Sequence, residues 1–291
     1  MNNMIIDLPP TRKNYRFPGI IGAKGWRFVI DWPKAKEKAN SRFFYFILTI
    51  FASLYITACS SVPSKTIPMP PISTSLPGPR MDAFHTVGPG ETLWRIGKMY
   101  DVSVDELIQT NHLSNPQDLK MGQELKVPNA AQIKPVVTLY PSDKWEYIII
   151  HHSGTEEGSA LQFHHWHLNK GWDKGVGYHF VIDTNQSSKQ DGQIESTPRW
   201  IKQEDGAHCK ADEMNPRAIG ICLVGNFDEE KVSQKQMAAL VFLVNKLRRH
   251  YKIPMDHVLG HGKVPGASTH CPGIHFPWGE FTNRLRNAHS E

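Results

Sequence analysis

A histidine and a cysteine stand ten residues apart in the segment 258–273, Val-Leu-Gly-His-Gly-Lys-Val-Pro-Gly-Ala-Ser-Thr-His-Cys-Pro-Gly. Its glycines and prolines favour an irregular loop, in which His261 and Cys271 can turn toward one point. A nitrogen ligand beside a thiolate suits zinc better than magnesium or calcium. Two ligands do not complete a site, and the same pair also fits a loop histidine and a small buried cysteine. A zinc site therefore requires a third ligand from elsewhere in the chain.

Two adjacent histidines follow a strongly apolar stretch and are the candidates for that third ligand. Residues 145–150, Trp-Glu-Tyr-Ile-Ile-Ile, are typical of a buried strand, and His151 and His152 come next. Neighbouring side chains of a strand point to opposite faces, so only one of the two can face the site. Either one would give two histidines and one cysteine with a fourth position open, as in catalytic zinc sites.

The segments around these residues alternate between strand and helix patterns. A helix is expected at 160–170, and a second one follows Ser233, its predicted N-cap, and runs to about Tyr251. Its apolar face is formed by Met237, Leu240, Val241, Val244 and Leu247. Further strands are expected at 177–183, 193–195, 219–225 and 257–259. The alternation predicts an α/β domain over residues 141–291, with a mixed central sheet flanked by helices.

The net charge of +5 comes from the N-terminal end of the chain. Residues 1–58 hold nine of the 33 Lys and Arg residues and three of the 28 Asp and Glu residues. This leaves 24 basic and 25 acidic residues in the remainder, which forms no basic stripe. We therefore expect no nucleic-acid partner.

Residues 1–58 have the features of a leader that ends in a lipoprotein signal peptide. The apolar run 41–56 follows a basic segment and is too short to span a bilayer comfortably. The sequence Ile-Thr-Ala-Cys-Ser around Cys59 resembles the lipobox of bacterial lipoproteins, in which the cysteine is lipidated. An uncleaved anchor or a chance cysteine is the alternative. By the resemblance, Ser60 after the cysteine implies a membrane anchor on the periplasmic side of the outer membrane.

The next two segments are a tether and a small module. Residues 59–83 are rich in Pro and Ser and are typical of an extended linker. Residues 84–129 resemble a LysM module, through G-E-T-L-W-R-I-G, Y-x-V-x-x-x-x-L and G-Q-x-L-x-V-P. The resemblance implies a βααβ fold that binds glycans containing N-acetylglucosamine, in a groove between Gly90–Leu93 and Leu113–Leu119. Residues 130–140 are expected to be a short linker.

Trp94 has two interpretations within this module. It is either a sugar platform that binds substrate or a core residue, and its helical position favours the core.

The segment 141–285 resembles the zinc N-acetylmuramoyl-L-alanine amidase and peptidoglycan recognition protein family. The motifs, in order, are I-I-H-H-S-G, G-Y-H-F, G-A-H, I-G-I-C-L-V-G-N and G-H…T-x-C-P-G. By position, the resemblance makes His151 the third Zn²⁺ ligand with His261 and Cys271. It also places Tyr178 and Thr269 beside the metal as catalytic polar residues.

The implied reaction is hydrolysis of the amide between N-acetylmuramic acid and L-alanine in peptidoglycan or muropeptides. By the resemblance, zinc activates a water molecule, and Tyr178 or Thr269 stabilises the oxyanion. Some relatives carry a glutamate acid/base where this chain has Cys222, so the proton donor to the leaving amine stays open. His208 either binds a substrate carboxylate or is structural. His179 is expected to be a packed histidine.

Two questions remain beside this interpretation. Cys209 and Cys222 are available for a disulfide, but Cys222 lies in a predicted buried strand, which argues against pairing. The alternatives to an amidase are a catalytically inactive recognition or scaffold protein and a zinc peptidase that cuts within the peptide stem. All three ligands are present, which favours an enzyme. We expect it to be a monomer.

Overall fold

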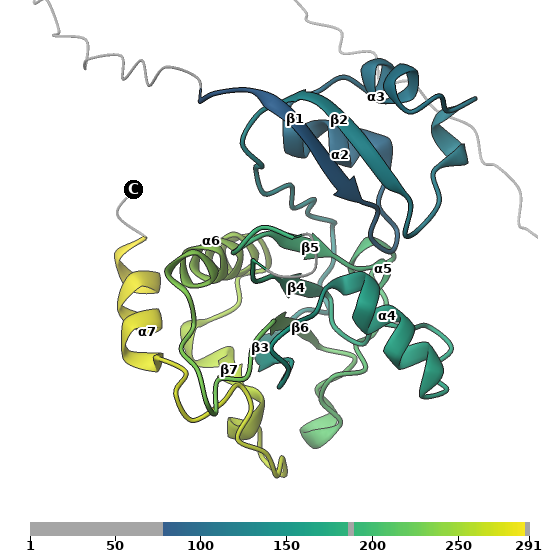
Figure 1. Cartoon of the computed structure of the whole chain (residues 1–291). Helices are drawn as coiled ribbons and strands as arrows, with labels where there is room; N and C mark the ends of the chain where they lie inside the picture. Colours follow the sequence, from purple (N-terminus) through teal and green to yellow (C-terminus); the bar gives the residue numbers. More distant parts are fainter. Residues whose placement is uncertain (1–77, 186–188, 289–291) are drawn as a thin grey trace, which may run out of the picture. The chain divides into compact units, whose positions relative to one another are not determined.

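The computed structural model describes residues 78–185 and 189–288. The leader, Cys59 and most of the predicted tether lie outside the described residues. The first element group is the antiparallel pair β1 (Met81–Thr86) and β2 (Glu124–Ala130), with α2 (Leu93–Tyr100), α3 (Val104–Thr110) and a short 3₁₀ turn (Pro116–Asp118) between them. This is the expected βααβ order, and Figure 1 shows the two helices beside the strand pair.

Local capping fixes where the two helices of this module begin. The Thr92 side chain accepts a hydrogen bond from the backbone of Arg95, and Ser103 forms a reciprocal capping box with Glu106. Helix α2 buries Leu93, Ile96 and Tyr100, whereas Trp94 is 56% exposed. The core interpretation of Trp94 is therefore wrong, because one residue of helix turns a side chain about 100° away from its buried neighbour.

The second element group is built on a five-stranded sheet in the order β5-β4-β6-β3-β7. Its strands are β3 (Tyr147–His152), β4 (Phe180–Ile182), β5 (Ile194–Ser196), β6 (Ala218–Leu223) and β7 (Val258–Gly260). Strand β3 is parallel to both β6 and β7, β4 is parallel to β6, and β5 is antiparallel to β4. The predicted mixed sheet is confirmed.

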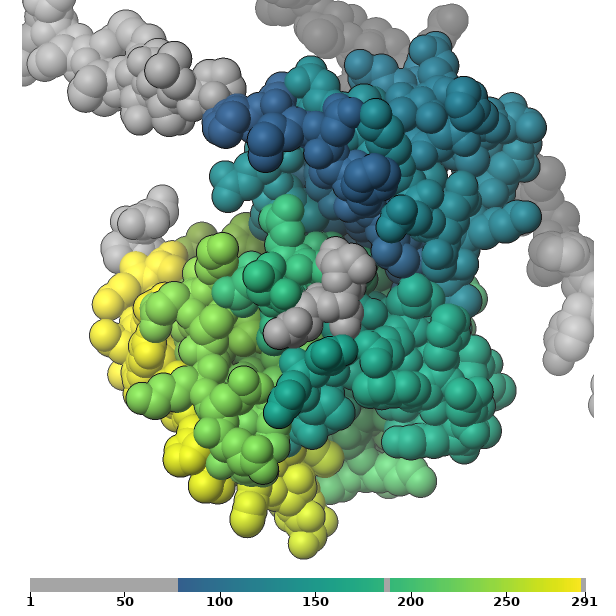
Figure 2. Space-filling view, viewed as in Figure 1, coloured from purple at the N-terminus to yellow at the C-terminus, as the bar shows by residue number. Residues whose placement is uncertain are grey.

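Helices cover both faces of this sheet (Figure 1). They are α4 (Ala160–Asn169), the single turn α5 (Pro198–Ile201), α6 (Gln234–Tyr251) and α7 (Trp278–Asn287). The predicted cap of α6 is confirmed, because Ser233 and Gln236 form a capping box. Neither α5 nor α7 is predicted from the sequence. Helix α7, in yellow, lies beside α6 at the surface (Figure 2).

The two faces of the sheet are packed differently. The large apolar cluster includes Ile148 and Ile150 of β3 together with the buried side of α6, including Leu240 and Leu247. The opposite face carries two smaller clusters, one with Phe163 of α4 and one with Ile149 of β3. Since side chains alternate along a strand, His151 belongs to the face of Ile149 and not to the α6 face.

All described residues belong to one compact unit of the chain. Within the residues expected to be a linker, Val136 packs with the apolar cluster of the βααβ module and Val137 with that of the sheet. Short 3₁₀ turns occur at Ala211–Glu213, Met255–His257 and His261–Lys263. Among the described residues, no helix has the length and apolar character needed to cross a membrane.

Candidate metal centre

The register between β3 and β7 brings His151 and His261 together. Ile150 is paired with Gly260 in this parallel ladder. His151 follows Ile150 within β3, and His261 follows Gly260 directly after β7. Their ring centroids are 4.7 Å apart. Two histidines separated by more than a hundred residues therefore become neighbours because the residues that precede them are paired in the ladder.

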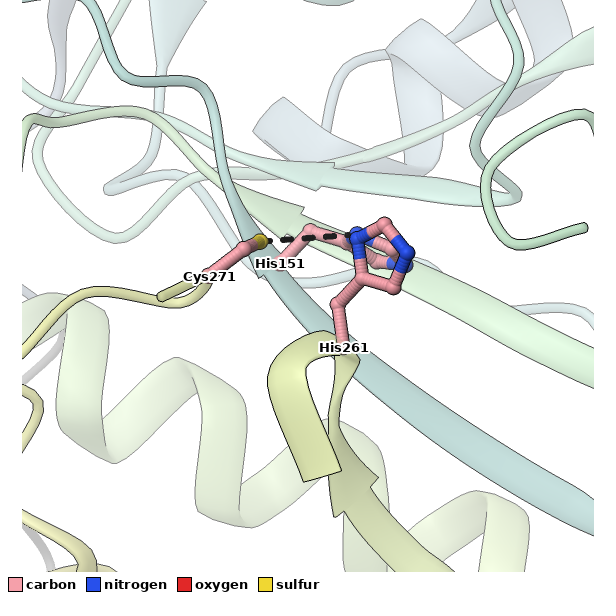
Figure 3. A group of neighbouring side chains, drawn as sticks. All are labelled: His151, His261 and Cys271. Carbon is pink, nitrogen blue, oxygen red and sulfur yellow. Dashed lines mark hydrogen bonds between the residues drawn. The ribbon is translucent and has the colours of Figure 1, made fainter. Parts of the chain in front are cut away.

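Cys271 returns to the same point through a closed loop. The Gly262 N–H donates to the Cys271 carbonyl at 2.7 Å, and the Cys271 N–H donates to the Thr269 hydroxyl at 3.1 Å. The ligand atoms of His151, His261 and Cys271 all lie within 4.8 Å of one another. Figure 3 shows the three side chains converging, with His261 and Cys271 on one loop and His151 on β3.

The donor set fits zinc. Two imidazole nitrogens and one cysteine sulfur are ligands that zinc prefers. They leave the fourth position of a tetrahedral site for water or substrate. Burial raises the pKa of the Cys271 thiol to about 12, although a hydrogen bond from the His152 N–H opposes this shift. Burial lowers the pKa of His151 well below its ordinary value, and the neighbouring histidines lower it further. Neutral imidazoles are the form that binds a metal, and a bound cation would favour the thiolate.

Tyr178 lies beside His151. It immediately precedes His179 and β4, and its ring centroid is 5.2 Å from that of His151. Burial raises the pKa of Tyr178 well above its ordinary value of 10.0, and the Cys222 and Cys271 thiols raise it further. The phenol therefore stays protonated, and its side chain is hydrogen-bonded with the Cys222 thiol.

Thr269 is exposed, and its hydroxyl oxygen accepts the hydrogen bond from the Cys271 N–H. This contact holds the cysteine in the loop and leaves the hydroxyl proton free to donate.

The structure also defines the surroundings of His152 and His179, two further histidines considered from the sequence. The backbone of His152 contacts the Cys271 sulfur, while its ring lies 6.1 Å from that of Phe227. His179 is fully buried and hydrogen-bonded at both ring nitrogens, to the Gly220 N–H and the Glu204 carbonyl, so it is a packed histidine.

Cys209, Cys222 and Cys271 are free thiols. Cys222 is paired with His151 across the β3–β6 ladder, and its thiol is buried, which raises its pKa well above the ordinary value. Cys209 belongs to a different apolar cluster from Cys222.

One contact of the site was not foreseen. The Nδ1 atom of His208 lies 3.0 Å from Nε2 of His151. The sequence carries a signal that another group lies close to the backbone of β6. Gly220 interrupts this buried strand, and a glycine in a strand interior often marks a site of close approach. The histidine that approaches cannot be named from that signal.

Two parts of the chain match models of known families. Residues 141–274 match the family model described as N-acetylmuramoyl-L-alanine amidase, and residues 85–128 match the LysM domain model. The endolysin of Enterobacteria phage K11 is 31% identical over 135 residues, which cover 43% of this chain and 78% of that protein. This chain belongs to the N-acetylmuramoyl-L-alanine amidase family.

Some of the similar proteins are named as recognition proteins. Peptidoglycan-recognition protein SC1a of Drosophila melanogaster is 30% identical over 145 residues, covering 46% of this chain and 71% of that one. Among solved structures, the endolysin amidase LysCS from Clostridium intestinale URNW is 31% identical and covers 53% of this chain and 95% of its own, with a TM-score of 0.43. Membership of the amidase family alone therefore leaves the activity to be argued from the site.

Proposed function

We propose that this protein is a zinc-dependent N-acetylmuramoyl-L-alanine amidase that removes peptide stems from peptidoglycan or muropeptides. The observation that carries the proposal is the convergence of His151, His261 and Cys271, with ligand atoms within 4.8 Å of one another. Three ligands leave a position open, whereas a structural zinc site is closed by four. When bound there, zinc supplies a water of pKa about 7 and polarises the scissile carbonyl.

The residues of the chain then have separate tasks. The protonated phenol of Tyr178 is placed to donate a hydrogen bond to the oxygen that gains negative charge during hydrolysis. The exposed hydroxyl of Thr269 is a second hydrogen-bond donor at the edge of the metal site. Its oxygen accepts a hydrogen bond from the Cys271 backbone N–H. No glutamate occupies the position of Cys222, whose buried thiol remains protonated.

The alternative function is that of a recognition protein without catalytic activity. A binding protein has no need for a complete set of metal ligands, and this chain retains two histidines, the cysteine and the tyrosine in one place. We therefore give the enzyme precedence.

The test is release of peptides from purified sacculi by the full chain. Removing the metal with a chelator is expected to stop the release, and added zinc is expected to restore it. Cys271→Ala is expected to abolish both zinc retention and release. Undiminished release by Cys271→Ala would refute the proposed chemistry.

The LysM module is proposed to bind the glycan strand. Trp94 is 56% exposed and lines a surface pocket of about 320 Å³ with Lys98 and Asp101, so its indole is accessible to a ligand. Aromatic faces of this kind contribute apolar contact area with a polar N–H at the edge. Trp94→Ala is expected to weaken sedimentation with sacculi while leaving cleavage of soluble muropeptides unchanged. Equal sedimentation of the variant and the parent protein would remove Trp94 from the binding surface.

The chain is further proposed to act in the cell envelope as a lipoprotein anchored through Cys59 on the periplasmic side of the outer membrane. This proposal is supported by the sequence Ile-Thr-Ala-Cys-Ser alone. Incorporation of labelled palmitate that disappears in Cys59→Ser is the expected result. Labelling that persists in the variant would contradict it.

A further inference from the structure

His208 lies directly behind a proposed metal ligand. Its Nδ1 atom is 3.0 Å from His151 Nε2, and its Nε2 atom is 3.2 Å from the carbonyl oxygen of Ala218. The other ring nitrogen of His151, Nδ1, lies 3.6 Å from the Cys271 sulfur. All four ring nitrogens of the two histidines therefore have a neighbour, and both nitrogens of His208 are taken by protein groups.

The positions of the protons in this chain of contacts follow from the Ala218 carbonyl. A carbonyl oxygen only accepts, so His208 Nε2 must carry a proton and donate it. In a neutral imidazole the other nitrogen is then an acceptor, so His208 Nδ1 accepts from His151 Nε2–H. His151 Nδ1 is left without a proton, and its lone pair faces the Cys271 sulfur, where the metal ligands converge.

Hydrogen bonds and close packing hold His208 in this orientation. The backbone N–H groups of His208 and Cys209 both donate to the Asn215 side-chain oxygen, at 2.9 and 2.8 Å. The ring rests on two glycines: a Cβ added to Gly206 or Gly220 would lie 2.4 Å from its Cδ2 atom. Only residues without a side chain at those two positions leave room for the imidazole.

We infer that His208 is a positioning residue that fixes the tautomer and ring orientation of His151, so that His151 presents Nδ1 to the metal. His208 does not bind the metal or a substrate carboxylate, because neither ring nitrogen is free for that role. Groups that hold the second nitrogen of a histidine ligand commonly contribute a factor of about 10 to 100 to metal affinity. This inference rests on the proposed zinc site and goes beyond it by assigning the group behind the ligand.

The experiment measures zinc affinity by competition with a chromophoric chelator in the full chain. Binding by the parent protein tests the zinc site itself, and the variants test the role of His208. His208→Phe, which keeps a ring but no acceptor, is expected to weaken zinc binding by about 10- to 100-fold. His208→Asn is expected to recover most of this loss, because its side-chain oxygen branches from the same carbon as Nδ1. His250→Ala, which removes an exposed histidine at the end of α6, is the control and is expected to bind like the parent.

Zinc affinity within twofold of the parent in His208→Phe would overturn the inference, as would an Asn variant as weak as the Phe variant. A second measurement does not depend on any variant folding well. Long-range ¹H–¹⁵N correlation spectra of the zinc-bound parent protein are expected to show protons on Nε2 of both His151 and His208, and none on Nδ1 of either. A proton on Nδ1 of His208 would overturn the assignment.

Discussion

His151 and His261 lie side by side because the residues before them, Ile150 and Gly260, are partners in the parallel β3–β7 ladder. A one-residue slip of this register would move His151 to the opposite face of the sheet. The metal centre therefore depends on strand pairing in the core as well as on the three ligand side chains. The loop that returns Cys271 to the pair includes a close approach of the Gly262 and Thr269 backbones.

Gly262→Ala tests that contact. A Cβ at this position would lie 2.2 Å from the Thr269 carbonyl oxygen, so the loop must shift and carry Cys271 away from His261. We expect zinc affinity to fall by at least about tenfold, which corresponds to about 1.4 kcal/mol. Gly279→Ala is the matched control, since a Cβ there meets no atom within 4 Å. Normal zinc affinity in Gly262→Ala would mean that the loop tolerates the displacement.

Tyr178→Phe separates catalysis from metal binding. The variant keeps the ring that packs near His151 but loses the protonated hydroxyl. Loss of one donor to a developing oxyanion commonly lowers kcat by about 10²- to 10³-fold. We expect a loss of this size with an unchanged zinc content, measured on a soluble muropeptide. Tyr147→Phe, whose ring stacks on His257, serves as the control. A kcat near that of the parent would assign oxyanion stabilisation to another group.

Glu195 and Lys189 form a buried ion pair that should support the sheet. Their charged atoms are 2.8 Å apart and both side chains are 3% exposed, and Glu195 also accepts the Ala160 N–H at the start of α4. Glu195→Gln removes the nearest anion from the Lys189 ammonium, which keeps the weaker attraction of Glu91 and Asp183. The free energy of unfolding is therefore expected to fall by about 2 kcal/mol, less than the roughly 3–5 kcal/mol lost when a buried charge keeps no partner.

The exposed pair of Glu280 and Arg284 provides the comparison for chemical denaturation. Its side chains are 36% and 38% exposed, and Glu280→Gln is expected to change the free energy of unfolding by less than about 1 kcal/mol. Equal effects of Glu195→Gln and Glu280→Gln would contradict the assigned role of the buried pair.

Glu91 predicts a loss of stability in acid. Burial alone would raise its pKa, but the hydrogen bond from His85 and the positive charges of His85 and Lys189 outweigh burial and lower the pKa to about 2. Arg95 is a further cation near this carboxylate. A lowered pKa stabilises the folded state above the ordinary value of 4.5, and this stabilisation is lost as the pH falls from 4.5 toward about 2.

The lowered pKa of Glu91 is expected to contribute about 3 kcal/mol to the free energy of unfolding above pH 4.5. It is measured by denaturation at several pH values for the parent protein and for Glu91→Gln. Subtracting the two curves removes the acid sensitivity of the groups that do not interact with Glu91, including the zinc ligands. Parallel curves between pH 5 and pH 2 would show that Glu91 does not supply the term.

Sequence patterns predicted the strands and the ends of the long helix because apolar periodicity and the Ser233 cap are local signals. They predicted that only one residue of the His151–His152 pair could face the metal, but the choice of His151 required the family resemblance. The pairing of Ile150 with Gly260 is a long-range register and leaves no local mark.

Other features were missed for equally physical reasons. Phe281 and Leu285 of α7 are four residues apart and buried, but two apolar positions alone do not distinguish a helix from an irregular segment. Trp94 follows Leu93 directly, and composition alone does not say which of two adjacent helical residues faces outward. The Lys189–Glu195 pair is buried only because distant segments enclose it.

The central claim is the identity of the bond that is cut, and mass spectrometry of digested sacculi tests it most directly. The account predicts that the full chain with zinc releases stem peptides with a free L-alanine amine and leaves glycan strands with intact muramic acid. Cys271→Ala under the same conditions is predicted to release none. Peptides cut within the stem, cleaved glycan strands, or the same products from Cys271→Ala would contradict the account.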